Sequence, residues 1–188
     1  INFILITNDP VIASNAEASG VGRIFVDLER IGKKARQGHL NTHISDHSPE
    51  DIATIRSSIS RAQLMVRVNP LHSGTQEEID FAIESGADLL MLPMFQHEEE
   101  VREFSDLVKG RVGIVPLVET YSATKTIDKI VKIPSIAEVY IGLNDLHLDM
   151  QMKFMFEPLA NGLVDTMAET IRKSEVPFGF GGIARVGE

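Results

Sequence analysis

Seven apolar β-type runs recur about every 25 residues along the chain, and segments with helical character separate most of them. The predicted strands span residues 3–7, 23–28, 63–68, 88–94, 112–118, 138–142 and 177–183. The predicted helices span residues 10–18, 50–59, 75–85, 98–109, 123–131 and 156–171. Near-continuous apolar strands that alternate with helices are typical of a parallel sheet covered by helices. This alternation predicts an α/β fold.

The even spacing of the strands favours a (β/α)8 TIM-type barrel, formed by residues 1–188 as a single domain. A doubly wound open sheet is the alternative. Its dinucleotide-binding form is weakened because no Gly-x-Gly-x-x-Gly motif follows the first strand. A closed barrel needs an eighth strand, whereas the pattern stops after the seventh. We therefore expect a barrel truncated after its seventh strand, and a natural polypeptide that is longer.

The net charge and the composition of the chain argue against several classes of partner and of chemistry. With 18 basic and 27 acidic residues the net charge is −9, which argues against nucleic acid or an anionic membrane. No apolar run approaches the roughly 20 residues that span a bilayer. The chain has no cysteine, so disulfide and thiolate chemistry are excluded. A reducing, cytoplasmic location is expected.

Two acidic residues end consecutive predicted strands. Glu119 follows the fifth apolar run and Asp145 follows the sixth, and in a β/α barrel the chemistry lies at these strand ends. Neighbouring carboxylates repel unless a proton or a cation separates them. Two carboxylates joined by water and substrate oxygens are a typical site for Mg²⁺ or Mn²⁺. The alternative is that each residue, or its neighbour, only caps the following helix.

Charged residues also end the second and third predicted strands. Asp27 and Glu29 lie on one side of the second strand end, where either is a candidate base or an outer partner of a metal. Arg67 ends the third strand, and its guanidinium can bind a carboxylate through two parallel hydrogen bonds. The alternatives are an ion pair of Arg67 with Glu29 or Glu119, and pairing of the two acids with nearby arginines.

The positions of the histidines and lysines help to distinguish metal-dependent chemistry from Schiff-base chemistry. His39, His43 and His47 lie four residues apart, but the residues between them favour a loop over a zinc-binding helix. We expect one of them, with His39 and His43 as the leading candidates, to act as a catalytic base, and His147 is the alternative. A Schiff-base aldolase needs a buried lysine. No lysine falls on a predicted strand, and Lys33 lies in a predicted loop, so the sequence favours metal chemistry.

Five motifs at strand ends carry a family resemblance. They are Val26-Asp27-Leu28-Glu29, Val66-Arg67-Val68-Asn69, Met91-Leu92-Pro93-Met94, Leu117-Val118-Glu119-Thr120 and Tyr140-Ile141-Gly142-Leu143-Asn144-Asp145-Leu146. In this order they resemble the HpcH/HpaI aldolase and citrate lyase beta-subunit family, which has phosphoenolpyruvate/pyruvate-type barrels.

The resemblance implies roles for these positions. Glu119 and Asp145 match the metal ligands, and Arg67 matches the residue that binds the keto-acid carboxylate. Pro93, Met94 and Asn144 are expected to contribute to substrate binding. Asp27 matches an acid that supports a catalytic histidine, but this chain has Arg30 where the aldolases have that histidine. Either a histidine of residues 39–47 replaces it, or the reaction differs.

These observations predict a metal-dependent carbon–carbon lyase of the class II aldolase type. It would cleave or form a 4-hydroxy-2-keto acid through a pyruvate enolate, with pyruvate and an aldehyde as partners and Mg²⁺ or Mn²⁺ as cofactor. One alternative is an acyl-CoA lyase or a phosphoenolpyruvate-handling enzyme on the same barrel. Another is a non-catalytic binding or assembly subunit. Large apolar residues within 148–156 suggest a homo-oligomer, although core packing explains them equally well.

Overall fold

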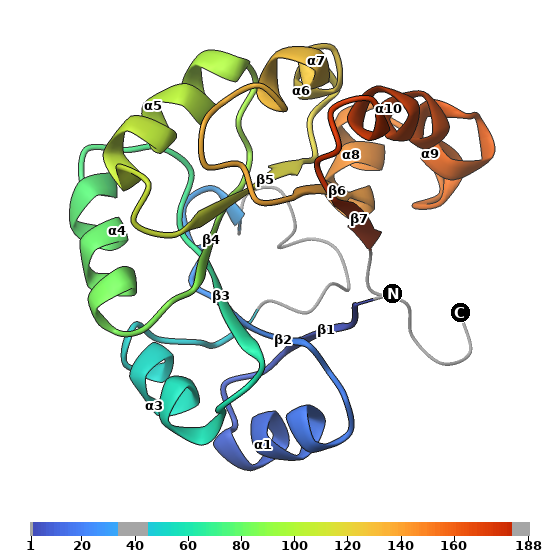
Figure 1. Ribbon diagram of the computed structural model, residues 1–188. Helices are drawn as coiled ribbons and strands as arrows, with labels where there is room; N and C mark the ends of the chain where they lie inside the picture. The colour runs from blue at the N-terminus through green and yellow to red at the C-terminus, as the bar shows by residue number, and fades with distance from the viewer. Residues whose placement is uncertain (1, 34–44, 182–188) are drawn as a thin grey trace. The chain divides into compact units, whose positions relative to one another are not determined.

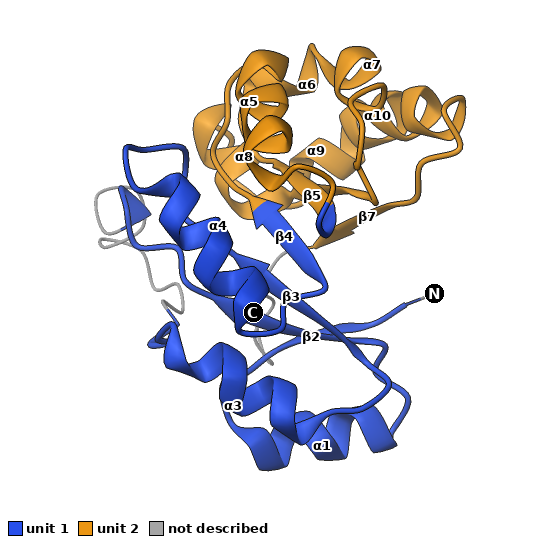
Figure 2. Cartoon of the chain, turned by 60° about the vertical axis from the view of Figure 1, so that its left-hand side comes forward, with its two compact units in different colours: residues 1–91, 111–113 blue, residues 92–110, 114–188 orange. Residues whose placement is uncertain are grey.

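The computed structural model describes residues 2–33 and 45–181, and the contacts between them divide the chain into two compact units. Unit 1 comprises residues 1–91 and 111–113, and unit 2 comprises residues 92–110 and 114–188 (Figure 2). Both units are built from parallel strands that alternate with helices along the chain (Figure 1).

Unit 1 contains a parallel sheet in which the strands neighbour one another in chain order. Its strands are β1 (Ile4–Ile6), β2 (Arg23–Asp27), β3 (Gln63–Arg67) and β4 (Leu89–Leu92). Its helices are α1 (Pro10–Ala18), α3 (Glu50–Ser58) and α4 (Thr75–Glu84). The register places Asp27 of β2 beside Arg67 of β3, so that two charged side chains end neighbouring strands.

The core of unit 1 follows from the apolar strands. Ile24, Val26, Leu64 and Val66 are fully buried, and helices α1 and α3 pack against each other and against β2. Helix α1 begins as the sequence predicts, because Asp9 accepts hydrogen bonds from the N–H groups at the helix start.

Unit 2 also has parallel strands in chain order, with helices around them. The strands are β5 (Gly113–Val118), β6 (Val139–Gly142) and β7 (Phe178–Gly181). The helices are α5 (Glu98–Val108), α6 (Tyr121–Thr124), α7 (Ile127–Ile130), α8 (Leu143–Asp149), α9 (Glu157–Ala160) and α10 (Leu163–Arg172).

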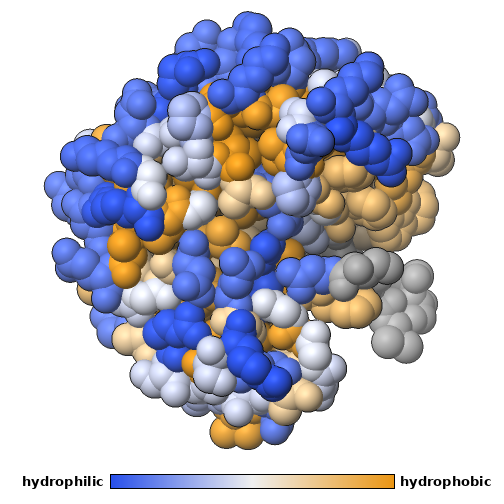
Figure 3. Space-filling view, in the orientation of Figure 1, coloured by the Kyte–Doolittle hydropathy of each residue, from blue (hydrophilic) through white to orange (hydrophobic). Residues whose placement is uncertain are grey.

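Helices α5 and α10 of unit 2 are amphipathic. Helix α5 buries Val101 and Phe104, and α10 buries Met167 and Ile171. Both helices pack on α7, and hydrophilic residues lie over their visible outer sides (Figure 3). In both segments the buried residues recur at steps of three and four, which places them on one side of each helix.

The seven predicted strands are confirmed, with ends displaced by a few residues. Two helix predictions are corrected, and one further helix was not predicted. The helix predicted at 123–131 is split into α6 and α7, and the one predicted at 156–171 is split into α9 and α10. Gly162 has a positive φ of 80° at the second break, a conformation that favours glycine. Helix α8 was given no predicted range, because Asn144 and Asp145 were interpreted as a strand end, with capping of a following helix by Asp145 as the alternative.

The prediction of a barrel is confirmed only in its coarser form. The described residues contain seven strands, each parallel to its neighbours within its own unit, and they alternate with helices in chain order. They show an α/β fold of this type and not a complete eight-stranded barrel. No helix among the described residues combines the length and apolar character needed to cross a membrane.

Candidate functional site

The first candidate cluster lies at the carboxyl ends of the strands in unit 2. Glu119 directly follows β5 and is only 2% exposed. Its Oε1 accepts a hydrogen bond of 3.0 Å from the backbone N–H of Met94. Met94 follows Pro93 and has a φ of 56°, which is uncommon for a residue with a side chain. The strained turn therefore directs a backbone N–H at the Glu119 carboxylate.

Gly142 allows the Glu119 carboxylate to approach helix α8. A Cβ atom at position 142 would lie 3.0 Å from Glu119 Oε2 and 3.1 Å from Glu119 Cβ. Gly142 precedes α8, and Asp145, in the first turn of that helix, is buried with an exposure of 8%. We call Glu119 and Asp145 the acidic pair. The missing Cβ of Gly142 is the space into which the Glu119 carboxylate fits.

The two residues of the acidic pair are of the type found in sites for small, hard divalent cations. Its donors are oxygen atoms only, and Mg²⁺ typically binds one or two protein carboxylates and completes its shell with water and substrate oxygens. Across the described residues, no group of three or more His, Cys, Asp or Glu side chains is arranged to hold a metal ion. A cation at the acidic pair would therefore depend on ligands from solvent or substrate.

Helix capping does not account for Glu119. The N-cap of the following helix α6 is Thr120, whose hydroxyl accepts a hydrogen bond from the N–H of Ala123. The sequence alternative of capping by a neighbour is therefore confirmed for Thr120. This capping bond does not involve Glu119, so it does not explain why the Glu119 carboxylate is buried.

The second candidate cluster lies at the ends of β2 and β3 in unit 1. Arg67 binds Asp27 through two parallel hydrogen bonds of 2.8 Å, from Nε to Oδ1 and from Nη2 to Oδ2. Arg67 Nε also lies 3.5 Å from Glu29 Oε2. The guanidinium carbon lies 5.6 Å from the centre of the Phe25 ring. The sequence alternative of an Arg67–Glu29 ion pair is confirmed, but Asp27 is the closer partner.

Lys33 completes this cluster, and sequence reasoning missed it. Its side chain is 4% exposed, and Nζ donates a hydrogen bond of 2.6 Å to Asp27 Oδ2. The same Nζ lies 3.7 Å from Glu29 Oε2. We call Asp27, Glu29, Lys33 and Arg67 the β2–β3 cluster. The sequence analysis placed Lys33 only in a predicted loop and did not foresee its burial against Asp27 and Glu29. Its spacing of four residues from Glu29 was the available signal.

The cations of the cluster control the ionisation of Asp27. Burial alone would raise the pKa of Asp27, but hydrogen bonding and charge from Arg67 and Lys33 outweigh it. The pKa of Asp27 is thus held well below its ordinary value of 3.8. Asp27 is a permanent anion near neutral pH and is therefore a poor proton acceptor.

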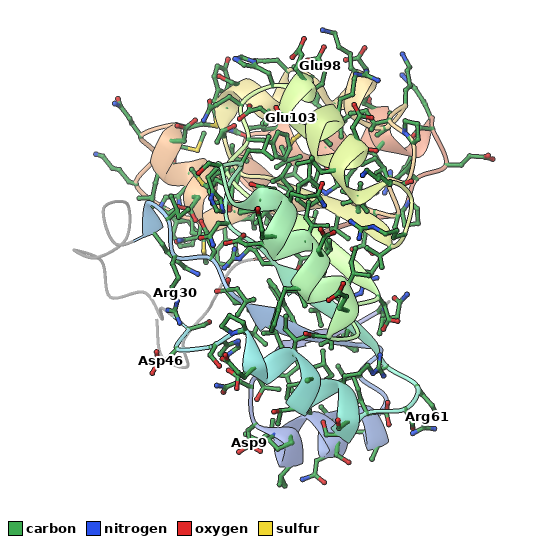
Figure 4. All side chains as sticks on the ribbon, turned by 90° about the vertical axis from the view of Figure 1, so that its left-hand side faces the viewer. Asp9, Arg30, Asp46, Arg61, Glu98 and Glu103 are labelled. Carbon is green, nitrogen blue, oxygen red and sulfur yellow. The ribbon has the colours of Figure 1, made fainter. Side chains whose placement is uncertain are left out.

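Arg30 holds residues 45–47 against the end of β2. Its guanidinium donates to the carbonyl oxygens of Ser45 (2.5 Å) and His47 (2.6 Å) and lies 3.7 Å from Asp46. Figure 4 shows Arg30 and Asp46 side by side. His47 is buried, and its Nδ1 accepts a 3.0 Å hydrogen bond from the Asp27 backbone N–H. This bond places the His47 proton on Nε2, so the ring is oriented as a donor.

The structure brings some predicted site residues together and leaves others separate. Asp27, Glu29 and Arg67 form one cluster, while Glu119, Met94 and the helix bearing Asp145 form another. Pro93 is buried and Asn144 is half-buried at the start of α8. His39 and His43 lie outside the described residues.

Comparison with known proteins decides the family. The family model for HpcH/HpaI aldolase/citrate lyase matches residues 3–157. The chain belongs to this family. No curated protein sequence matches it.

Solved structures of family members share the fold. An HpcH/HpaI aldolase from Desulfitobacterium hafniense is 17% identical, with a TM-score of 0.75 over 98% of this chain and 78% of that one. A family protein from Burkholderia cenocepacia is 13% identical, with a TM-score of 0.74 over 95% and 78%. A citrate lyase beta subunit from M. tuberculosis, complexed with oxaloacetate and magnesium, is 14% identical, with a TM-score of 0.67 over 95% and 76%.

Proposed function

We propose that this family member is a metal-dependent carbon–carbon lyase that acts on a 2-keto acid through a pyruvate enolate. The family consists of aldolases and citrate lyases, which supports a lyase acting on keto acids. The observation that carries the metal dependence is the buried Glu119 carboxylate, which is oriented by the Met94 N–H and fits against Gly142. The substrate of the proposed reaction is a 4-hydroxy-2-keto acid, and the second product is an aldehyde.

The acidic pair would hold the cation, with Mg²⁺ or Mn²⁺ as the preferred ions. The M. tuberculosis neighbour was solved with magnesium and oxaloacetate, a keto acid, which supports this choice. When bound, such a cation acts as a Lewis acid that stabilises negative charge on the oxygens of a keto acid. The contribution of the chain is to fix Glu119 and to exclude water around it, because both carboxylates are buried.

Arg67 would bind the carboxylate of the keto acid. Its paired hydrogen bonds to Asp27 hold the guanidinium plane in one orientation, which lowers the entropy lost when an anion binds. Asp27 thus acts on the substrate through Arg67. Pro93, Met94 and Asn144 remain proposed substrate contacts, and Glu29 a proposed outer partner.

Proton transfer needs a group other than Asp27, whose carboxylate is bound by two cations. His39 and His43 remain our proposed bases. His47 takes a different role, because its Nδ1 is occupied by the Asp27 N–H and its Nε2 carries the proton.

The test is exchange of the pyruvate methyl protons with deuterium, with and without EDTA. We expect metal-dependent exchange by the wild-type protein, and a loss of about 1,000-fold or more in Glu119→Gln and Asp145→Asn. Glu103→Gln removes an exposed carboxylate from α5 and serves as the matched control, with unchanged exchange. Exchange that survives EDTA, or that persists in both acidic-pair variants, would refute the proposal.

A second candidate is a binding subunit without turnover. The observation that favours it is the engagement of Arg30, at the position of the family histidine, with backbone carbonyls. Binding of pyruvate or oxalate without any proton exchange, in the presence of Mg²⁺ or Mn²⁺, would support this candidate over the lyase. An acyl-CoA lyase or phosphoenolpyruvate-handling activity would instead appear as weak exchange with no dependence on an aldehyde.

A further inference from the structure

The turn after β2 carries Lys33 back over the end of its own strand. The Lys33 N–H donates to the Arg30 carbonyl, and Gly32 provides a φ of 74° within the turn. Asn69 at the end of β3 fixes this turn, because its Oδ1 accepts from the N–H groups of Arg30 (2.8 Å) and Ile31 (2.9 Å). The position of Lys33 is therefore set by the backbone of two strand ends.

A lysine ammonium is rarely buried without a reason, since its desolvation is unfavourable. Lys33 is 4% exposed, and its Nζ contacts Asp27 Oδ2 and Glu29 Oε2. Arg67 approaches the same two acids, through Asp27 at 2.8 Å and Glu29 at 3.5 Å. Both acids thus lie between the same two cations.

Lys33 adds a positive charge beside the two acids of the β2–β3 cluster. Summed over Asp27, Glu29, Lys33 and Arg67 alone, two carboxylates and two cations give a formal charge of zero, and removal of Lys33 lowers this sum by one. An incoming carboxylate is repelled by an uncompensated buried anion a few ångströms away, because the interaction is poorly screened inside a protein. A second cation beside Asp27 and Glu29 therefore favours the binding of an anionic ligand by Arg67.

We propose that Lys33 is a positioning and specificity-determining residue, which neutralises Asp27 and Glu29 so that Arg67 can bind the carboxylate of an anionic keto acid. This inference rests on the proposed function and names a residue that sequence reasoning placed in a loop. Lys33 acts through the two acids and through Arg67, and forms no covalent bond with the substrate.

The experiment measures oxalate binding by calorimetry in the presence of Mg²⁺, because oxalate mimics the planar enolate of pyruvate. We expect Lys33→Met to weaken oxalate binding roughly 10- to 100-fold. Lys33→Arg keeps the charge and should bind within about threefold of the wild type. Lys132→Met removes the same charge from an exposed position and should leave binding unchanged.

A double variant separates charge from shape. Glu29→Gln combined with Lys33→Met removes one charge of each sign and returns the cluster to zero, so we expect it to recover most of the lost affinity. If Lys33→Met fails to fold, the double variant and Lys33→Arg still report on charge and geometry. Each variant is checked by circular dichroism before binding is measured.

The outcomes are distinct. Unchanged oxalate binding in Lys33→Met, or a loss that the double variant does not recover, would overturn the inference while leaving the proposed lyase in place. A product trapped on Lys33 by borohydride in the presence of pyruvate would also overturn it, because it would indicate imine chemistry. A wild-type protein that binds neither oxalate nor pyruvate would overturn the proposed function together with this inference.

Discussion

Asp27 is the last residue of β2, Glu119 directly follows β5, and each is 2% exposed, yet the two acids have different partners. Asp27 is bound by two cationic side chains, Lys33 and Arg67. One of the contacts of Glu119 is a hydrogen bond from the backbone N–H of Met94, a neutral donor that helps to orient its carboxylate. Burial alone therefore does not identify a metal-binding carboxylate. The groups that contact a buried carboxylate also decide whether it can bind a metal.

The largest expected effect comes from breaking the Asp27 side of this comparison. Asp27→Asn leaves Lys33 and Arg67 without their shared anion, and removing one member of a buried ion pair typically lowers the free energy of unfolding by about 3–5 kcal/mol. Urea denaturation followed by circular dichroism measures this change. A loss below about 1 kcal/mol would show that the cluster contributes little to stability.

The second-largest effect is expected from displacing the Glu119 carboxylate. Gly142→Ala introduces a Cβ about 3.0 Å from Glu119 Oε2, so the carboxylate must shift by a few tenths of an ångström. We expect affinity for Mn²⁺ to fall roughly tenfold, while the free energy of unfolding changes by less than about 1.5 kcal/mol. Unchanged Mn²⁺ affinity would argue that the position of Glu119 does not matter for the metal.

The pH dependence of stability sharpens the comparison. Because the folded-state pKa of Asp27 lies below its ordinary value of 3.8, its contribution to stability is present above that pH. The contribution is lost as the pH falls through the folded-state pKa. Wild-type protein should therefore lose stability below about pH 4 more steeply than Asp27→Asn, as urea unfolding at several pH values would show. Equal slopes would contradict the ion pairing.

The smallest effect is expected at the opposite ends of the strands, where Glu17 accepts backbone N–H bonds from Ser60, Arg61 and Ala62. The first two causes of its lowered pKa, about 2 instead of 4.5, are the bonds from Ala62 and Arg61. Glu17 contributes stability above about pH 4.5 that is lost as the pH falls toward 2. Glu17→Gln should lower Tm slightly at pH 7 and leave Mn²⁺ affinity unchanged. An altered Mn²⁺ affinity would show that a substitution at Glu17 affects metal binding.

The sequence contained enough information to predict the strands and most of the helices, because apolar periodicity and glycine or proline breaks act locally. Asp9 was recognised as a helix cap for the same reason. The breaks that divide residues 123–131 and 156–171 were missed, since turns of this kind depend on packing as well as on residue type. Helix α8 is only seven residues long, and so short a segment has little periodicity to detect.

The candidate site was predictable where a residue directly ends a strand, as with Asp27, Arg67 and Glu119. Lys33 was not, because its burial depends on the turn fixed by Asn69, a residue 36 positions later in the chain. The orientation of Glu119 depends on the positive φ of Met94 and the missing Cβ of Gly142. Neither feature can be read from the sequence without knowledge of which strand ends meet.

Titration with Mn²⁺ followed by electron paramagnetic resonance tests the central claim most directly, because it reports which acids hold the ion. Wild-type protein and Asp27→Asn, once shown to be folded, should each bind Mn²⁺, with Glu119→Gln and Asp145→Asn losing at least about 100-fold in affinity. Full Mn²⁺ binding by Glu119→Gln, or its loss only in folded Asp27→Asn, would contradict the assignment of the acidic pair as the metal ligands.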